Sequence, residues 1–303
     1  MAPFAFGGNV FGWTADERRS FELLDAFVDA GFNLIDTADV YSRWVPGRRG
    51  GESEAILGRW LRERGRRKEV VLATKVGMDA GPQGAGLSRR HILDAVDGSL
   101  ARLGIDSIDL YQSHEDDPKV PIQETLSTYE ELLKAGKIRA IGASNFTAAR
   151  LVESLEVARR EGLPRYECLQ PRYNLMDRSG FEDDLATVCQ RHDLGVITYS
   201  SLASGFLSGK YRSKDDLGKS PRGARAEARL TDRGRAILAA LDETAAECSA
   251  APSTVALAWL ISRPGVSAAI ASATSLPQLE ELTAAADLRL SPAAIERLDR
   301  ASR

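Results

Sequence analysis

Short apolar runs alternate with amphipathic stretches along the whole chain of 303 residues. Each apolar run is continuous and has the length of a strand that is buried on both faces, as in a parallel sheet covered by helices. The runs occupy residues 4–11, 32–36, 70–76, 108–113, 138–143, 166–171, 195–200 and 266–271. The pattern therefore predicts eight strands.

Each predicted strand is followed by a stretch in which apolar residues recur with helical spacing. Asp16 and Ser88 are candidate N-caps for helices over 16–30 and 88–103. The other helical stretches are 52–64, 121–135, 147–160, 181–193, 232–248 and 276–286. Eight strand–helix units without a linker or a shift in composition predict an α/β fold, a single-domain (β/α)8 TIM barrel over residues 1–303. A doubly wound sheet is the competing architecture.

One connection is much longer than the others. Residues 202–230, after the seventh predicted strand, show neither a helical nor a strand period. From Gly209 to Arg235 the chain contains nine Lys or Arg and only four Asp or Glu. A long loop in a compact domain is usually functional or disordered. The two interpretations are a solvated surface loop and a basic flap that folds over an anionic ligand at the top of the barrel.

Composition and charge exclude several classes of protein. The 40 basic residues nearly balance the 43 acidic ones, and the net charge of −3 gives no argument for nucleic acid or for an anionic membrane as partner. The cysteines, Cys168, Cys189 and Cys248, are odd in number and widely separated, which fits neither a disulfide framework nor a metal site. No secretion signal or run of 18 apolar residues is present. We expect a cytoplasmic protein.

Side chains that can transfer or stabilise a proton end three successive predicted strands. Asp36, Lys75 and His114 end strands two, three and four, and Tyr41 lies in the loop after Asp36. Active sites of such barrels lie at the C-terminal ends of the strands. Because neighbouring strands are about 4.8 Å apart, the four side chains can converge on one pocket. As a cation Lys75 lowers the pKa of Tyr41, Asp36 keeps Lys75 charged, and His114 can orient a substrate oxygen. The group is predicted to protonate a carbonyl oxygen.

Each of these residues, taken alone, has a structural interpretation. A strand-end Asp usually caps a turn, and a strand-end Lys is usually solvated. His114 begins the run His-Glu-Asp-Asp (114–117), which suggests a metal site at first sight. Four adjacent polar residues that leave a strand cannot all point at one ion, so no metal is predicted. The right residue type at three consecutive strand ends favours the catalytic interpretation of the group.

The motifs around these residues resemble those of the aldo-keto reductases, a family of NAD(P)(H)-dependent carbonyl reductases built on a (β/α)8 barrel. The resemblance covers nearly the whole chain. The motifs are DTADVY (36–41), GESE (51–54), ATK (73–75), DLYQSH (109–114), IGASNF (141–146), LQPRYN (169–174) and YSSL (199–202). The resemblance implies that Asp36, Tyr41, Lys75 and His114 form a catalytic tetrad, with Tyr41 as the general acid in the reductive direction.

The resemblance also implies a dinucleotide site. Ser144, Asn145 and Gln170 are expected to hydrogen-bond the nicotinamide carboxamide, and Tyr199 is expected to lie under the nicotinamide ring. The pyrophosphate is expected to be wrapped by backbone amides, hydroxyls and one cation. The residues that supply these groups are Ser200, Ser201, Leu202, Ser204, Gly205 and Lys210. This site gives the long loop 202–230 a role as a cover for the cofactor.

The adenine end follows the eighth predicted strand. Its candidate residues are Ser272, Thr274, Gln278 and Glu281. Many relatives have Lys or Arg in the place of Thr274, where it pairs with the 2′-phosphate of NADPH, and often have Asn in the place of Leu282. Hydroxyls and a helix N-terminus can still bind phosphate, but discrimination is expected to be weaker. NADPH is the expected cofactor, and NADH or dual use stays open.

Substrate residues are the least defined part of the prediction. Trp13 after the first strand and Trp44 beyond Tyr41 are candidates for the walls of the pocket, with core packing as the alternative. Three arginines in residues 43–51 can steer an anionic substrate or can simply be solvated. Aromatic walls suit sugars and other small carbonyl compounds alike.

Together these features predict an NADP(H)-dependent oxidoreductase that reduces an aldehyde or ketone, such as a sugar or another small carbonyl compound, to the alcohol. The alternative is a nicotinamide-binding regulatory subunit with little or no turnover, as some members of the family are. A metal-dependent barrel hydrolase is disfavoured because His91 and His192 both fall in helical stretches. The expected partner is a small-molecule substrate. The sequence carries no prediction of the oligomeric state.

Overall fold

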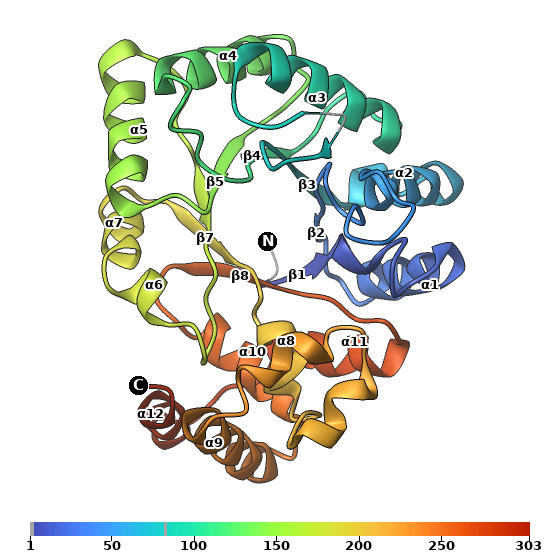
Figure 1. The fold of residues 1–303 in the computed structure, drawn as a ribbon, viewed down its shortest axis with the longest axis vertical. Helices are drawn as coiled ribbons and strands as arrows, with labels where there is room; N and C mark the ends of the chain where they lie inside the picture. The colour runs from blue at the N-terminus through green and yellow to red at the C-terminus, as the bar shows by residue number, and fades with distance from the viewer. Residues whose placement is uncertain (1–2, 82–83) are drawn as a thin grey trace.

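The computed structural model describes residues 3–81 and 84–303, and within them eight parallel strands close into a barrel in chain order (Figure 1). All eight apolar runs contain a strand, as predicted. The strands are β1 (Phe4–Gly7), β2 (Leu34–Asp36), β3 (Val71–Val76), β4 (Leu110–Ser113), β5 (Ile141–Ser144), β6 (Cys168–Gln170), β7 (Gly195–Thr198) and β8 (Val266–Ala271). The pairing of β1 with β8 closes the barrel.

Helices follow the strands and surround the barrel (Figure 1). They are α1 (Glu17–Asp29), α2 (Glu52–Arg64), α3 (Arg89–Leu103), α4 (Ile122–Lys134), α5 (Ala148–Glu161), α6 (Ser179–Glu182), α7 (Leu185–Arg191), α8 (Gly223–Glu227), α9 (Asp232–Cys248), α10 (Pro252–Ile261), α11 (Leu276–Thr283) and α12 (Pro292–Ala301). The candidate caps are confirmed, because Asp16 accepts the Arg19 amide of α1 at 2.8 Å and Ser88 accepts the His91 amide of α3 at 3.4 Å.

One small apolar cluster fills the interior of the barrel below the C-terminal ends of the strands. Its buried members are Ala5, Leu34, Ala73, Leu110, Cys168, Ile197, Ala268 and Ile270. Because side chains alternate along a strand, the residue two positions further on points inward again. Along the four strands, the next inward residue towards the C-terminal end is polar: Asp36 follows Leu34, Lys75 follows Ala73, Gln112 follows Leu110 and Gln170 follows Cys168. A polar layer therefore covers the apolar one at the C-terminal ends of the strands.

Besides α8 in the long connection, two helices were not predicted from the sequence. α10 buries every residue from Ser253 to Leu260, so it has no polar face and no amphipathic period to detect. α12 packs beside α9 at the outer edge of the molecule (Figure 1). The stretch 181–193, predicted as one helix, is instead divided into α6 and α7.

The long connection 202–230 is ordered as three short helical segments. They are the 3-10 helices η4 (Ala203–Ser208) and η5 (Lys214–Lys219), followed by α8. Segments of five or six residues are too short to show a period in the sequence, which is why none was predicted. Within the described residues, no helix is long and apolar enough to cross a membrane. All three cysteines are free thiols.

Candidate active site

The four residues predicted as a tetrad lie together at the C-terminal end of the barrel. The Lys75 ammonium, fully buried, donates to Asp36 Oδ2 at 2.6 Å, to the carbonyl of Thr37 at 2.8 Å and to the Tyr41 hydroxyl at 3.0 Å. All three of its protons therefore have a partner. The β2–β3 pairing sets Asp36 opposite Ala73, two residues before Lys75, so the two charges lie on neighbouring strands.

Asp36 is held from its other side by two amides. Gln170 Nε2 donates to Asp36 Oδ1 at 2.9 Å and Gln112 Nε2 approaches the same oxygen at 3.4 Å. Gln170 also donates to Gln112 Oε1 at 3.2 Å. Sequence reasoning missed Gln112, although its position two residues after the inward Leu110 would have placed it in this layer. The carboxylate is fixed so that its second oxygen faces Lys75.

The environment of Tyr41 sets its proton affinity. Burial raises the pKa of Tyr41 to about 12, and the positive charge and hydrogen bond of Lys75 oppose this rise without overcoming it. The expected contribution of Lys75 has the predicted direction, but the predicted net lowering of the Tyr41 pKa is wrong. Tyr41 is consequently a neutral phenol at neutral pH, with an oxygen that already accepts a hydrogen bond from a cation.

Lys75 is a cation, whereas His114 is uncharged. Burial disfavours the ammonium of Lys75, but Asp36 and Tyr41 outweigh it and raise the pKa of Lys75 above its ordinary value. For His114, burial and then the charge of Lys75 lower the pKa well below its usual range. The His114 ring lies 6.1 Å from the Tyr41 ring between centroids, and its Nδ1 is buried without a hydrogen-bond partner. His114 is therefore an uncharged imidazole beside the phenol.

A second buried acid lies on the turn between Asp36 and Tyr41. Asp39 is 2% exposed, and its Oδ1 has no hydrogen-bond partner. Burial and then the nearby Glu54 carboxylate raise the pKa of Asp39 to about 7. Glu54 itself is fully buried and accepts from Thr74 at 2.6 Å and from Arg102 at 2.7 Å. Ionisation of Asp39 therefore destabilises the folded protein relative to the unfolded one.

We expect Asp39→Asn to stabilise the protein at pH 8 and above by about 2–4 kcal/mol, because an amide cannot ionise. An unfolded Asp ionises near pH 4, whereas the folded residue ionises near pH 7. The stability difference between variant and wild type should open as the pH rises between these values and stay constant above them. Urea unfolding across this range measures it, and a difference that does not change with pH would contradict the assignment.

A cavity of about 560 Å3 extends from Asp36 and Tyr41 to the N-terminus of α11. It is lined by most of the predicted cofactor residues: Tyr199, Ser200, Ser201, Leu202, Ser204, Gly205, Lys210, Ser272, Thr274, Gln278 and Glu281. A volume of this order suits a bound small molecule or cofactor. The residues predicted for the pyrophosphate and the adenine end thus share one cavity with the phenol.

The backbone at the middle of this cavity has an uncommon conformation. Ser200, Ala203 and Ser204 have φ angles of 55°, 48° and 60°, in the left-handed region, and Gly205 has a φ of 90°. Successive amides in mixed right- and left-handed conformations form concavities that bind anions. A Cβ at Gly205 would lie 3.1 Å from the Lys210 ammonium, so this cation lies directly against the segment. The donors fit a phosphate group.

The long basic loop contributes cations that were not predicted individually. Lys219, Arg222 and Arg225 line the cavity together with Lys210. The Arg222 guanidinium lies 5.1 Å from the Trp13 ring centroid. With the Asn9 amide turned so that its oxygen faces Arg222, the guanidinium donates to that oxygen at 2.8 Å. Burial lowers the pKa of Arg222. The flap interpretation of 202–230 is supported by this placement. Only the loop's basic composition could have indicated Arg222, because it follows no period.

None of the predicted carboxamide ligands is among the described residues that line this cavity: Asn145 lines a neighbouring cavity, and Ser144 and Gln170 are buried. Ser144 donates to the Gln170 carbonyl at 2.8 Å, and Gln170 holds Asp36 as described above. Asn145 donates to the His114 carbonyl at 2.8 Å and accepts from the Tyr199 hydroxyl at 2.7 Å. The three residues therefore connect Tyr199 with the tetrad by hydrogen bonds.

The two candidate substrate residues form an aromatic cluster with the phenol. Trp44 packs edge-on against both Trp13 and Tyr41, with 5.8 Å between centroids in each pair. Trp44 is 42% exposed and so is not in the core, and neither tryptophan is among the described residues that line the 560 Å3 cavity. Of the three arginines near the mouth, Arg43 is paired with Asp79.

The candidate metal motif has other functions. Asp116 pairs with Arg150 at 2.9 Å, and Asp117 accepts the Leu87 amide at 2.9 Å. Across residues 3–81 and 84–303, no group of three or more His, Cys, Asp or Glu side chains is arranged to hold a metal ion. The described side chains of this motif stabilise the loops around the site.

Comparisons with known proteins agree with this geometry. The sequence model described as "Aldo/keto reductase family" matches residues 3–303. The aldo-keto reductase YhdN of Bacillus subtilis is 35% identical over 93% of this chain and 83% of its own length. A putative voltage-gated potassium channel subunit beta of Schizosaccharomyces pombe is 33% identical over 89% of this chain and 80% of its own. The protein tas of Escherichia coli is 33% identical, covering 96% and 91%.

Proposed function

The chain belongs to the aldo/keto reductase family, and on that premise we propose that it is an NADP(H)-dependent oxidoreductase that reduces an aldehyde or ketone to the alcohol. The observation that carries the proposal is the hydrogen bond from the buried Lys75 ammonium to the Tyr41 oxygen, at 3.0 Å, on the wall of a cavity lined by cations. This arrangement supports proton donation at the place where an anionic cofactor and a carbonyl would meet.

The chain's own residues supply the proton and the charge stabilisation. Tyr41 transfers its hydroxyl proton to the substrate oxygen, and Lys75 stabilises the phenolate that remains. Asp36 keeps Lys75 charged, and neutral His114 donates a hydrogen bond to the same substrate oxygen. When the cofactor is bound, its nicotinamide would supply the hydride that the carbonyl carbon receives. One hydride and one proton convert the carbonyl group into an alcohol.

The pH dependence of the two directions should differ. Reduction needs Tyr41 protonated, and with a pKa of about 12 it stays protonated across the neutral range. We therefore expect kcat for reduction to be flat between roughly pH 6 and 9. Oxidation of an alcohol needs the phenolate, so its rate should rise with pH towards tenfold per unit. Pre-steady-state rates in both directions test this, and a reduction rate that falls tenfold per unit above pH 7 would contradict it.

NADPH is the proposed cofactor, with NADH as the alternative. Four cations line the cavity, which favours the more anionic dinucleotide, but the adenine end itself offers only neutral or acidic side chains. There, the amide and hydroxyl of Thr274 both donate to Gln278 Oε1, at 2.9 and 3.1 Å. Neutral donors at this end would bind the 2′-phosphate more weakly than a fixed positive charge would.

We expect Thr274→Arg to increase the preference for NADPH over NADH by about tenfold, because a guanidinium pairs well with a phosphate. Dissociation constants for both cofactors from fluorescence quenching measure the ratio. Lys210→Gln is the matched control, since a cation proposed to contact the pyrophosphate should affect both cofactors alike. Equal changes for the two cofactors in Thr274→Arg would place the 2′-phosphate elsewhere.

The proposed substrate is a small carbonyl compound or a sugar that fits against Trp13, Trp44 and Tyr41. The experiment that tests the function is a panel of aldehydes, ketones and aldoses with cofactor absorbance as the readout. Consumption of NADPH with at least one member supports the proposal. Tight NADPH binding without consumption across the panel would contradict it.

That second outcome would favour a different function, a nicotinamide-binding regulatory subunit. The observation in its favour is the likeness to the fission yeast protein named as a putative potassium channel subunit beta. The hydrogen-bonded group of Asp36, Lys75 and Tyr41 supports the enzyme instead, because cofactor binding alone does not require a buried Lys–Asp pair on a phenol.

A further inference from the structure

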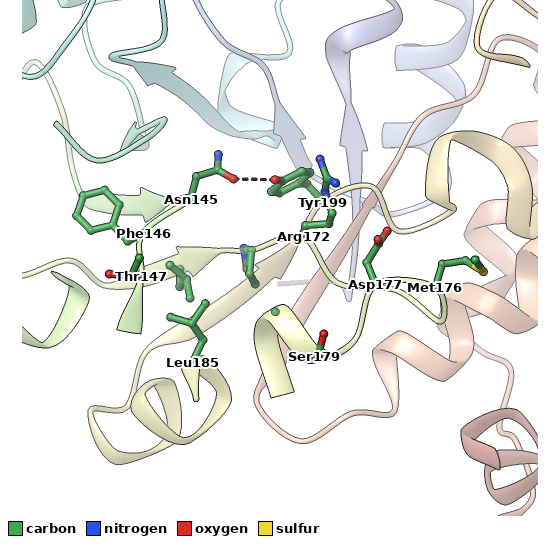
Figure 2. Close-up of a pocket in the computed structure, with 12 residues that line it drawn as sticks. Asn145, Phe146, Thr147, Arg172, Met176, Asp177, Ser179, Leu185 and Tyr199 are labelled. Atoms are coloured by element: carbon green, nitrogen blue, oxygen red, sulfur yellow. Dashed lines mark hydrogen bonds between the residues drawn. The ribbon is translucent and has the colours of Figure 1, made fainter. Parts of the chain in front are cut away.

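A second cavity, of about 440 Å3, lies next to the cavity proposed for the cofactor. Figure 2 shows residues that line it. It lies among the loops that follow β5 and β6 and the first residues of α6 and α7. Tyr199 lines both cavities. Among the described residues, no member of the tetrad lines the second cavity, so it is separate from the Tyr41 phenol, but Asn145 and Tyr199, both predicted to contact the nicotinamide, lie on its wall.

Apolar groups make up slightly more than half of the inner surface of this cavity, and polar groups make up the rest. Figure 2 shows Phe146 and Leu185 on one side and Met176 on the other, and Leu169 and Pro171 complete the lining. Phe146, Leu169 and Leu185 are at most 8% exposed, so these walls are fixed by the core behind them. Such a surface favours the apolar body of an organic molecule.

The cavity also contains one cation that is available for a ligand. The Arg172 guanidinium lies 5.8 Å from the Tyr199 ring centroid, and within the described residues it makes no ion pair or side-chain hydrogen bond. The carboxylate on the same rim, Asp177, is already bound by Asn174 at 2.9 Å and by Arg229 at 3.5 Å. The cavity therefore presents an unpaired guanidinium, with a carboxylate on the same rim that already has partners.

We propose that this cavity binds a small organic monocarboxylate with an aromatic or branched apolar body. A planar guanidinium pairs with a carboxylate through two parallel hydrogen bonds. One cation beside one acidic group provides too little positive charge for a phosphate dianion, and the apolar walls would leave a small inorganic anion without partners. An organic cation would face Arg172. A carboxylate at Arg172 with its body against Phe146 and Leu185 satisfies both halves of the surface.

Binding of benzoate to the cofactor-free protein, measured by titration calorimetry, tests the proposal independently of any reductase activity. We expect saturable binding with a dissociation constant on the order of 1 mM. Benzyl alcohol, which has a similar body and no charge, should bind at least about tenfold more weakly. Binding that does not saturate, or equal affinity for the two compounds, would overturn the proposal.

Two variants locate the binding. Arg172→Gln removes the guanidinium, and Ser179→Trp fills the cavity from its exposed rim; each should weaken benzoate binding by at least about tenfold. Arg191→Gln is the matched control, because Arg191 is an exposed cation at the far end of α7, and it should leave the affinity within about twofold. Benzoate bound near Tyr41 instead would be insensitive to both variants. That result would place the site in the catalytic cavity and refute the inference.

Discussion

Tyr41→Phe is expected to lower kcat for carbonyl reduction by about a thousandfold, within the range that a general acid contributes. The substitution removes only the hydroxyl that accepts from Lys75 at 3.0 Å. The ring keeps its contacts with Trp44 and His114, so the shape of the site is retained. The dissociation constant for NADPH should therefore stay within about twofold of the wild-type value, because the lost group acts on the reacting oxygen.

Tyr111→Phe is the matched control for this substitution. Tyr111 is fully buried on β4, two strands from β2, and its hydroxyl has no hydrogen-bond partner among the described residues. Removing an unsatisfied buried hydroxyl should leave kcat within a few fold and should not reduce stability. Retained turnover in Tyr41→Phe, or an equal loss in both variants, would show that the phenol of Tyr41 is not the proton donor.

Lys75→Met is expected to reduce the free energy of unfolding by about 3–5 kcal/mol and to abolish turnover. The ammonium is fully buried and lies 2.6 Å from Asp36, whose side chain is 3% exposed. Methionine has a similar length and no charge, so the Asp36 carboxylate would remain buried without its cation. Urea unfolding and the carbonyl assay measure the two effects on the same preparation.

The double variant Asp36→Asn with Lys75→Met separates stability from catalysis. A neutral amide at position 36 can still accept from Gln170 and Gln112, so most of the lost stability should return. Turnover should stay as low as in Lys75→Met, because the phenolate of Tyr41 would still lack a cation. Recovery of activity together with stability would mean that the pair serves the fold alone.

The barrel and the tetrad follow from periodicities that are visible in the sequence. Continuous apolar runs gave the strands, and alternation along each strand places Asp36 and Lys75 on the inner side above Leu34 and Ala73. The same rule applied to Gln112 would have completed the layer. These features depend on local chain geometry, which the order of residues determines directly.

Other features depend on the packing of distant segments and left no signal in the sequence. α10 is apolar on all sides because it is buried on all sides, so it resembles no amphipathic helix. Arg222 reaches Trp13 from a loop without any period. The net direction of the Tyr41 pKa required the extent of burial, which outweighs the neighbouring charge that the sequence did indicate. The lack of a hydrogen-bond partner for Asp39 Oδ1 likewise results from its burial, which the sequence does not indicate.

The most direct test of the account is the fate of deuterium placed at C4 of the NADPH nicotinamide. During reduction of an aldehyde by the wild-type protein, we expect one deuterium to appear on the carbinol carbon for each cofactor oxidised, as mass spectrometry of the alcohol would show. Tyr41→Phe should form almost none of this product while binding the cofactor normally. Tight NADPH binding with no deuterated alcohol from any carbonyl tested would contradict the central claim that this barrel is a reductase.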